Sequence, residues 1–175
     1  MSVELKKYVR DIRDFPKPGI IFKDITTILK EPVALKLTLK ELFKGTENLS
    51  ANKVVGIEAR GFIFGAMLAD KLDAGFVPIR KPGKLPAEVE KQTYALEYGT
   101  DTIEIHKDAI SPGDKVIIHD DLLATGGTAK AAAMLIEKLG GKVLQFSFII
   151  ELGFLNGRKV LSGYDVKSII IYNGD

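Results

Sequence analysis

The 175-residue chain contains no cysteine, which excludes disulfide bonds, thiol catalysis and thiolate metal sites. The absence also fits the reducing cytoplasm, where we expect the protein to reside. Neither sign of charge is in large excess, because 25 basic and 23 acidic residues leave a formal net charge of only +2. This near balance of charges, together with the lack of a long basic run, argues against nucleic acid or an acidic membrane surface as a partner.

Long apolar runs are missing as well. The N-terminal sequence MSVELKKYVRDI is too polar for a signal peptide or a membrane span. Its apolar residues recur at helical spacing, which predicts a short amphipathic helix over residues 3–12. These residues are Leu5, Tyr8, Val9 and Ile12. With 46% hydrophobic and 27% charged residues and no visible boundary, residues 1–175 are expected to form one globular domain.

The chain does contain a regular alternation of predicted helices and strands. Strands that are apolar throughout and alternate with helices indicate an α/β fold with a central parallel sheet flanked by helices. The helices are predicted near residues 32–43, 61–72 and 127–139, and the strands near residues 54–57, 76–79, 116–119, 143–150 and 168–172. Residues 93–97 and 102–105 instead alternate apolar and polar side chains around Gly99, which predicts a projecting antiparallel hairpin.

The most informative segment is KVIIHDDLLATGGTAK, residues 115–130. An apolar strand leads into two adjacent acids, Asp120 and Asp121, which then stand where ligands bind in parallel sheets, at the carboxyl end of a strand. Two carboxylates there can accept hydrogen bonds from a vicinal diol such as that of a ribose. Strand alternation points the preceding His119 away from Asp120, so we interpret this histidine as structural.

A small-residue loop, ATGGT, follows the acids and opens a helix. It has no lysine, so a phosphate would be bound by backbone N–H groups, by the hydroxyls of Thr125 and Thr128, and by the positive end of the helix dipole. The segment matches neither GxxxxGK[ST] nor GxGxxG. Taken alone it would be an ordinary strand-to-helix turn with an N-cap threonine. The strand, the acid pair and the helix in register favour a phosphate site.

These residues resemble the phosphoribosyl pyrophosphate (PRPP) motif of the type I phosphoribosyltransferases. Four more segments occur in the order found in the adenine-specific branch of that family: FPKPGIIFKDIT at residues 15–26, EARGF at 58–62, RKPGKLP at 80–86 and YALEYG at 94–99. The resemblance covers nearly the whole chain. It implies the type I fold, with a small hood over about residues 1–30 and a flexible lid over about residues 81–102. The implied reaction transfers the 5-phosphoribosyl group from PRPP to N9 of adenine, giving AMP and pyrophosphate in purine salvage.

The resemblance also implies which residues bind PRPP. Asp120 and Asp121 would bind the ribose hydroxyls, and the following loop would bind the 5′-phosphate through Ala124, Thr125, Gly126, Gly127 and Thr128. Pyrophosphate would be held by Ala59, Arg60, Arg80, Lys81 and Lys84. Mg²⁺, held mainly by PRPP and water and not by a protein-made metal site, would share in neutralising its charge.

Four residues are implied to bind adenine: Ile21, Phe22, Lys23 and Leu152. Ile21 would read the purine edge with its backbone N–H and C=O, Phe22 would stack on one face, and Leu152 would form the floor on the other. Adenine presents an acceptor at N1 beside a donor at N6, so a 6-oxo purine would leave buried groups unpaired. Lys23 stands where the family usually has arginine, so a point charge replaces any bidentate contact.

Two residues are implied to act in catalysis. Glu97 would serve as the general acid or base that handles the adenine proton as N9 attacks, and Arg60 would act on the leaving group. Tyr98 would support the closed lid. The bond between Ala59 and Arg60 is implied to be a non-proline cis peptide, a costly arrangement that tends to survive at functional sites.

Each feature also has a plainer interpretation when taken alone. Arg60 would form a surface ion pair, segment 80–86 a solvated basic turn, and Glu97 a solvated hairpin acid. Phe22 and Leu152 would belong to the core. Transfer to another purine, or a non-catalytic PRPP-sensing regulator, remain alternatives, although a regulator should carry a DNA-binding domain ahead of the fold and needs no lid acid. The predicted helix over residues 61–72 is apolar nearly all round, which favours a homodimer.

Overall fold

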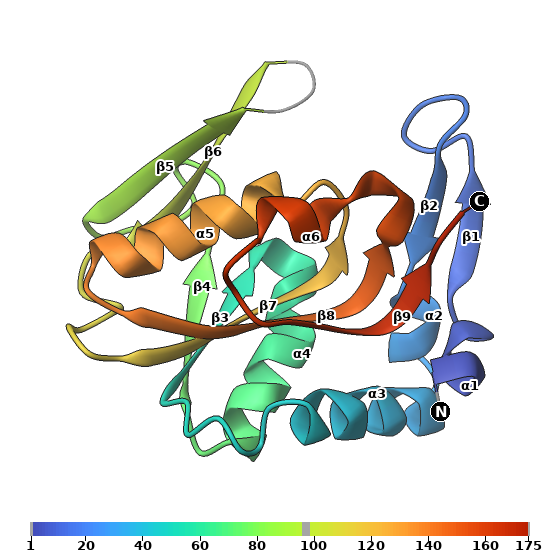
Figure 1. Ribbon diagram of the computed structural model, residues 1–175, viewed down its shortest axis with the longest axis horizontal. Coiled ribbons are helices and arrows are strands. Elements are labelled where there is room, and N and C mark those ends of the chain that lie inside the picture. Colours follow the sequence, from blue (N-terminus) through green and yellow to red (C-terminus); the bar gives the residue numbers. More distant parts are fainter. Residues whose placement is uncertain (1, 96–98, 175) are drawn as a thin grey trace.

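The computed structural model describes residues 2–95 and 99–174 and is built around a five-stranded parallel sheet (Figure 1). The strands lie in the order β4-β3-β7-β8-β9. Their bounds are Lys53–Ile57 for β3, Gly75–Ile79 for β4, Lys115–Leu123 for β7, Lys142–Leu152 for β8 and Val166–Tyr172 for β9. All neighbouring strands pair in parallel, as their apolar sequences require. The predicted fold class and all five predicted strands are confirmed.

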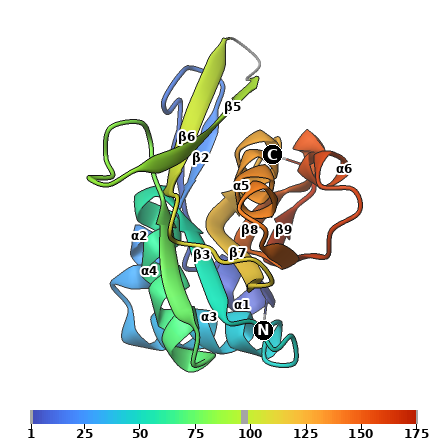
Figure 2. The same cartoon turned by 90° about the vertical axis from the view of Figure 1, so that its left-hand side faces the viewer.

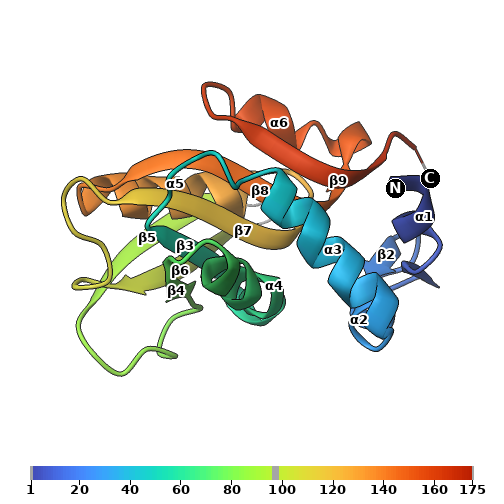
Figure 3. The ribbon, with the colours of Figure 1, turned by 90° about the horizontal axis from the view of Figure 1, so that it is seen from below.

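Helices cover both faces of this sheet. Helices α3 (Pro32–Lys44) and α4 (Glu58–Lys71) lie on one face, which Figure 3 shows from below, and α5 (Gly127–Lys138) and α6 (Gly157–Val160) lie on the other. Successive strand residues point to opposite faces, so one strand contributes to two apolar cores. Ile117 packs in the core under α3 and α4, and its neighbour Ile118 packs in the core under α5. Both are fully buried.

The N-terminal region differs from the sequence prediction. Helix α1 spans only Ser2–Lys6, and the next residues form a two-stranded antiparallel sheet of β1 (Arg10–Arg13) and β2 (Ile21–Asp24), followed by the short helix α2 (Thr26–Leu29). The predicted helix over residues 3–12 is therefore wrong beyond Lys6. In Figure 1 this small unit stands beside the end of β9.

Pairing across the β1–β2 ladder explains why these residues leave the helix. Arg10 lies opposite Asp24 and Asp11 lies opposite Lys23, so each cross-strand pair joins opposite charges. The Arg10 Nη2 to Asp24 Oδ2 distance is 2.5 Å, and the Lys23 Nζ to Asp11 Oδ1 distance is 2.9 Å. A helical arrangement of residues 3–12 would lose both pairs.

The predicted hairpin is confirmed and projects from the body of the molecule (Figure 2). It consists of β5 (Val89–Ala95) and β6 (Thr100–His106), so it is longer toward its base than the alternating pattern indicates. Ile103 and Ile105 are fully buried and anchor this base in the core under α5. Arg80 exchanges backbone hydrogen bonds with Glu104, which fixes the direction in which the hairpin leaves the sheet.

Two short elements after β8 had no clear signal in the sequence. A 3₁₀ turn, η1 (Gly153–Leu155), leads into α6. Arg158 holds α6 in place, because its guanidinium donates to both carboxylate oxygens of Glu151 at 2.7 and 2.8 Å and to the carbonyl of Val166. Among the described residues, no helix is long and apolar enough to cross a lipid bilayer.

Candidate active site

A cavity of 340 Å³ lies where the carboxyl ends of β3 and β7 meet the hairpin and the start of α5. Its walls combine acids, cations and hydroxyls from segments that are far apart in the chain. The lining residues are Ile57, Glu58, Ala59, Arg60, Lys81, Tyr94, Asp101, Ile103, Asp120, Asp121 and Thr128. Six of the predicted site residues line this one cavity: Ala59, Arg60, Lys81, Asp120, Asp121 and Thr128. A seventh, Arg80, contacts the lining residue Glu58.

The acid pair stands within β7, which continues to Leu123, and not beyond the end of the strand. Asp121 is buried, and its Oδ2 receives Arg60 Nε at 2.5 Å. Asp120 has no such cation, and burial together with the neighbouring charge of Asp121 raises the pKa of Asp120 well above its ordinary value of 3.8. The two carboxylates thus differ in role. Asp121 fixes Arg60, whereas Asp120 remains available to share a hydrogen bond with a ligand hydroxyl.

The loop between β3 and α4 is shaped by Glu58. This residue adopts φ +46°, in the left-handed region that non-glycine residues rarely occupy. Its carboxylate accepts a hydrogen bond from the backbone N–H of Lys81 and lies 3.5 Å from Arg80 Nε. Glu58 therefore ties this loop to the segment that leads into the hairpin, and the unusual backbone is held by those contacts.

The peptide bond between Ala59 and Arg60 is trans, so the implied cis bond is wrong for this structure. Helix α4 already begins at Glu58. Residues inside a helical turn need trans peptide bonds for their carbonyls to meet the N–H groups four residues later.

The loop after the acids takes the conformation that its glycines suggest. Gly126 adopts φ +86° and precedes the first turn of α5. The loop borders a second cavity, of 80 Å³, next to the first. Its lining residues are Asp120, Leu122, Leu123, Ala124, Thr125, Gly126, Thr128, Ala129 and Phe148. Backbone N–H groups, two threonine hydroxyls and the positive end of a 12-residue helix meet there, which suits a phosphate.

Gly157, at the start of α6, supports this loop from behind. A Cβ atom on Gly157 would overlap the carbonyl oxygen of Ala124, and a Cβ on Gly126 would lie 2.7 Å from the carbonyl oxygen of Gly157. The two backbones touch because neither residue has a side chain. The C-terminal segment, to which the sequence patterns assign no role, therefore supports the loop by direct backbone contact.

We expect Gly157→Ala to displace the loop, because the added methyl group must push the Ala124 carbonyl out of place. Overpacking of this kind costs about 1–3 kcal/mol. Affinity for ribose 5-phosphate should fall, measured by titration calorimetry, while Gly174→Ala, which meets nothing within 4 Å, serves as the control. Unchanged affinity in Gly157→Ala would show that α6 does not support the loop.

The hairpin contacts the phosphate loop directly. Thr128 Oγ1 donates to the Tyr94 hydroxyl at 2.9 Å, and that hydroxyl donates to Asp101 Oδ2 at 3.1 Å. Asp101 also forms an ion pair with Lys81. Lys84, by contrast, is exposed and does not line the cavity, so the structure does not bring it to the other cations.

The N-terminal unit reaches the site through one aromatic ring. The guanidinium carbon of Arg60 lies 5.3 Å from the centroid of the Phe22 ring, and Phe15 packs edge-on against the same ring. Lys23 is turned elsewhere, with its ammonium on Asp11 and 4.3 Å from the centroid of Tyr172. Its position between an acid and a ring makes Lys23 part of the connection between β2 and β9.

The remaining predicted residues are less informative in the structure. Ile21 pairs with Arg13 at the end of the β1–β2 ladder, and Leu152 is partly buried at the end of β8. Glu97 and Tyr98 lie outside the described residues. His119 is fully buried, and burial lowers its pKa to about 4, so its imidazole is neutral at physiological pH.

The comparison with known proteins decides the family. The model of the phosphoribosyl transferase domain matches residues 26–173. A protein of Christiangramia forsetii named adenine phosphoribosyltransferase is 56% identical over 171 residues, which cover 98% of this chain and 100% of that protein. The chain belongs to the adenine phosphoribosyltransferase family. The crystal structure of the adenine phosphoribosyltransferase from Thermoanaerobacter pseudethanolicus is 53% identical, with a TM-score of 0.96 over 98% of this chain and 100% of that one.

Another solved adenine phosphoribosyltransferase, from Saccharomyces cerevisiae, is described in complex with adenine and an imino-altritol bisphosphate. It is 42% identical, with a TM-score of 0.89 over 96% of this chain and 97% of that one. The match covers nearly the full length of both chains, so the N-terminal unit, the sheet and the hairpin lie almost entirely within the part of the chain that resembles that structure.

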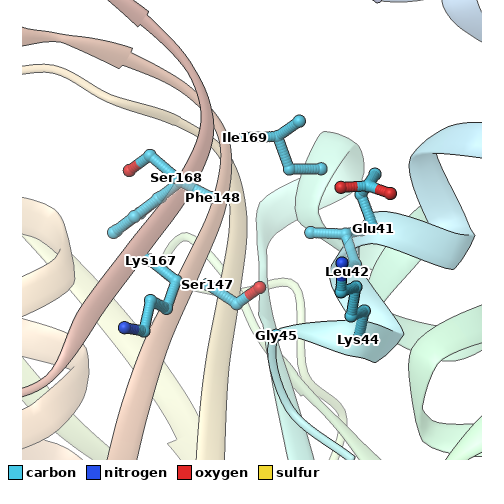
Figure 4. A pocket seen from close by; sticks show the side chains of 9 residues that line it. All are labelled: Glu41, Leu42, Lys44, Gly45, Ser147, Phe148, Lys167, Ser168 and Ile169. Carbon is cyan, nitrogen blue, oxygen red and sulfur yellow. The ribbon is translucent and has the colours of Figure 1, made fainter. Parts of the chain in front are cut away.

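A further cavity, of 310 Å³, lies away from the residues that match the motifs of this family. Figure 4 shows it between the last turn of α3 and the strands β8 and β9. Glu41, Lys44, Ser147 and Lys167 are among its lining residues, and none of the predicted site residues lines it. It is therefore separate from the candidate active site.

Sequence reasoning missed five residues of the active-site cavity: Ile57, Glu58, Tyr94, Asp101 and Ile103. Tyr94 belongs to the YALEYG segment that signals this adenine phosphoribosyltransferase family, but nothing in that segment shows that its ring reaches the phosphate loop. A hairpin centred on Gly99, as the sequence suggests, would place Tyr94 opposite Glu104, whereas the observed register pairs Tyr94 with Asp101.

Proposed function

We propose that the protein transfers the 5-phosphoribosyl group of PRPP to N9 of adenine, releasing pyrophosphate and forming AMP. The observation that carries this proposal is the convergence of the acid pair, Arg60, Lys81 and Thr128 on one cavity, with the glycine loop around the adjoining cavity. Adenine phosphoribosyltransferases from other organisms share more than half of their residues with this chain over nearly its full length. In the yeast enzyme, adenine and a sugar bisphosphate analogue bind together.

PRPP would lie along the cavity with its two ends in different environments. Asp120 and Asp121 would accept hydrogen bonds from the ribose hydroxyls, and the ATGGT loop would hold the 5′-phosphate in the adjoining 80 Å³ cavity. The pyrophosphate group would face Ala59, Arg60, Arg80 and Lys81. Lys84 would join them only if its segment moves, because it is exposed in this structure.

Adenine would bind beside the N-terminal unit. Phe22 would stack on the base, Leu152 would form the opposite wall, and Ile21 would meet the N1 and N6 edge with its backbone. Since the Arg60 guanidinium lies against the Phe22 ring, the base and the pyrophosphate group would be positioned from the same contact. Lys23 would act on the base only through the placement of β2.

The reaction breaks the bond between ribose C1 and the pyrophosphate oxygen, and the electron pair leaves with pyrophosphate. The C1 to N9 bond forms as oxocarbenium character is lost, and the N9–H proton passes to Glu97. Arg60 and Lys81 would stabilise the charge that develops on the departing oxygen. The hairpin would exclude water, which would otherwise hydrolyse PRPP at C1.

Mg²⁺ fits the residues of this cavity as a companion of PRPP. Among the described residues, no three His, Cys, Asp or Glu side chains converge as a ligand set, while Asp120 lines the cavity and forms no ion pair, although the charge of Arg60 acts on it. We therefore propose that pyrophosphate oxygens and water hold the ion, near Asp120. When bound, Mg²⁺ lowers the charge on the leaving group.

A panel of free bases tests the function. Purified protein with PRPP and Mg²⁺ should release pyrophosphate with adenine and not with hypoxanthine or guanine, and the product should be AMP. Hypoxanthine used as well as adenine would overturn the assignment of base recognition to Ile21. Absence of pyrophosphate release with every base, together with tight binding of PRPP, would support a sensing role instead.

We further propose that the protein acts in the cytoplasm as a homodimer that uses the outer face of α4. The inner face of this helix contributes Phe64 and Leu68 to the core, yet Ile63 on the outer face is also apolar and 39% exposed. Ala66 is also exposed and Met67 is half-buried, so apolar residues occupy more of this helix than one core needs, which favours an interface.

Sedimentation at micromolar concentration is expected to show a dimer, and Ile63→Glu is expected to shift it to the monomer of 19.2 kDa, because a charge would be buried at the contact. Val33→Glu, at an apolar residue that is 69% exposed on α3, is the matched control and should remain dimeric. A wild-type monomer with full activity would contradict the dimer.

A further inference from the structure

Two groups that the proposed function assigns to phosphate binding are already engaged by the hairpin. Tyr94 accepts the Thr128 hydroxyl at 2.9 Å and donates to Asp101 Oδ2 at 3.1 Å, and the same Asp101 oxygen receives the Lys81 ammonium. The donors and acceptors in this series of hydrogen bonds are consistent, since each hydroxyl donates once and the carboxylate only accepts. Tyr94 and Asp101 therefore connect Thr128 to Lys81 through β5 and β6.

These contacts are partly exposed, so solvent screens the ion pair in part. The side chains of Lys81 and Asp101 are 40% and 28% exposed, and the Tyr94 ring approaches the phosphate loop to within van der Waals distance of a Cβ placed on Gly127. The hydrogen bond and charge of Lys81 lower the pKa of Asp101. Burial opposes a charge on Lys81, but Asp101 outweighs it and raises the pKa of Lys81. Both groups are thus charged at neutral pH.

A bound PRPP cannot leave this arrangement unchanged. Asp101 lines the same cavity as Arg60 and Lys81, so its carboxylate would face the pyrophosphate group and repel it. The Thr128 hydroxyl has only one proton to donate, and an ammonium that moves toward pyrophosphate lengthens its ion pair with Asp101, although Lys81 carries three N–H donors. Each end of PRPP must therefore compete with one hairpin residue for its partner.

We propose that Tyr94 and Asp101 are positioning residues that hold Thr128 and Lys81 until PRPP displaces them, Tyr94 at the 5′-phosphate end and Asp101 at the pyrophosphate end. This inference rests on the proposed function and adds a substrate-released latch to it. Because Tyr94 and Asp101 also bind each other, a ligand at one end weakens the hold of the hairpin at the other. The hairpin is free to move over the cavity only after both ends have been exchanged.

Because PRPP must displace these contacts, the free energy of displacement determines whether a variant binds PRPP more tightly or more weakly. A binding site that is partly occupied by its own side chains has a lower apparent affinity, in proportion to the fraction of open molecules. Removing a latch contact should therefore tighten binding at the end that it guards. A residue that contacts phosphate directly would show the opposite sign.

Two variants and two separate probes test this inference. Tyr94→Phe keeps the ring and removes the hydroxyl, so ribose 5-phosphate should bind about three- to ten-fold more tightly, the scale of one neutral hydrogen bond, while pyrophosphate affinity should change much less. Asp101→Asn should give the crossed pattern, with pyrophosphate bound more tightly by at least that factor and ribose 5-phosphate little changed. Titration calorimetry with each probe, in the presence of Mg²⁺, measures both.

The same hairpin provides a matched control. Thr93 and Thr102 are paired one step further along the ladder, with their hydroxyl oxygens 2.9 Å apart and away from the cavity. Thr102→Val removes that hydrogen bond and should leave both affinities as in the wild type. If it reproduces the effects of Tyr94→Phe, a general loosening of the hairpin explains them and the latch is overturned.

The outcomes also separate this inference from the proposed function. A wild-type protein that neither binds PRPP nor forms AMP would refute the function itself. An active wild-type protein, with weaker or unchanged binding of the matching probe in both Tyr94→Phe and Asp101→Asn, would refute the latch alone. In steady-state assays the latch also requires KM for PRPP to fall in Tyr94→Phe, with KM for adenine unchanged.

Discussion

Glu97→Gln is expected to lower kcat by about 10²-fold or more, the usual scale of general acid–base catalysis. The glutamine side chain has nearly the same shape but cannot take the N9–H proton, so both substrate affinities should stay close to those of the wild type. Glu97 lies outside the described residues, and this expectation rests on its place in the YALEYG segment of the family. Single-turnover measurements with saturating PRPP and adenine isolate the chemical step.

Base selection and lid chemistry should separate in the same experiment. Adenine should still be preferred to hypoxanthine by Glu97→Gln, because that choice is assigned to the backbone of Ile21. Glu88→Gln is the matched control, since Glu88 precedes β5 and its side chain is 84% exposed beside Lys107. Wild-type chemistry in Glu97→Gln would reduce Glu97 to a solvated hairpin acid.

The second large effect is expected at the acid pair. Asp120→Asn and Asp121→Asn should each weaken PRPP binding by about 10- to 150-fold, the range for a hydrogen bond to a charged group, with adenine affinity unchanged because we assign the acids to the ribose. Calorimetric titration with PRPP and Mg²⁺ measures the loss. Unchanged PRPP affinity in both variants would remove the central argument for this active site.

The two variants should differ in stability, because the carboxylates differ in their surroundings. The raised pKa of Asp120 means that the folded protein retains a proton that the unfolded chain releases above about pH 3.8. The wild type therefore loses free energy of unfolding as the pH rises from that value to the raised pKa, and Asp120→Asn does not. At neutral pH we expect Asp120→Asn to unfold at a higher temperature than the wild type.

Asp121→Asn should not show this gain, since it removes the acceptor of the Arg60 guanidinium. Thermal unfolding of the wild type and both variants between pH 4 and pH 8 compares them. A stability difference between wild type and Asp120→Asn that does not depend on pH would show that the pKa of Asp120 is not raised in the folded state.

Local patterns in the sequence were sufficient for the sheet, its long helices and most of the site. The segment from Lys115 to Lys130 contains a strand, two acids and a glycine loop within 16 residues. The short chain between these groups is enough to keep them close together. The order of the family motifs then implied the reaction. The same kind of reasoning identified the hairpin, whose alternating side chains differ from the buried strands around it.

Other features depend on contacts between distant residues and could not be read from local patterns. The helix predicted over residues 3–12 gives way to β1 because its charges find partners in β2, whereas helix periodicity considers only neighbours along the chain. The peptide bond between Ala59 and Arg60 is trans because it lies in the first turn of α4. Lys81 enters the cavity and Lys84 does not, although only two residues lie between them, because Glu58 holds the backbone of Lys81.

The sequence by itself thus determined the chemistry of this protein, since the identity and order of its acids, glycines and cations are properties of the chain. Only the tertiary structure decided which of those groups meet. Tyr94 and Asp101 reach Thr128 and Lys81 because a hairpin crosses over a loop 34 residues further along the chain, and Gly157 touches Ala124 because two turns pack without side chains. Such contacts depend on distances in space, which no spacing along the sequence encodes.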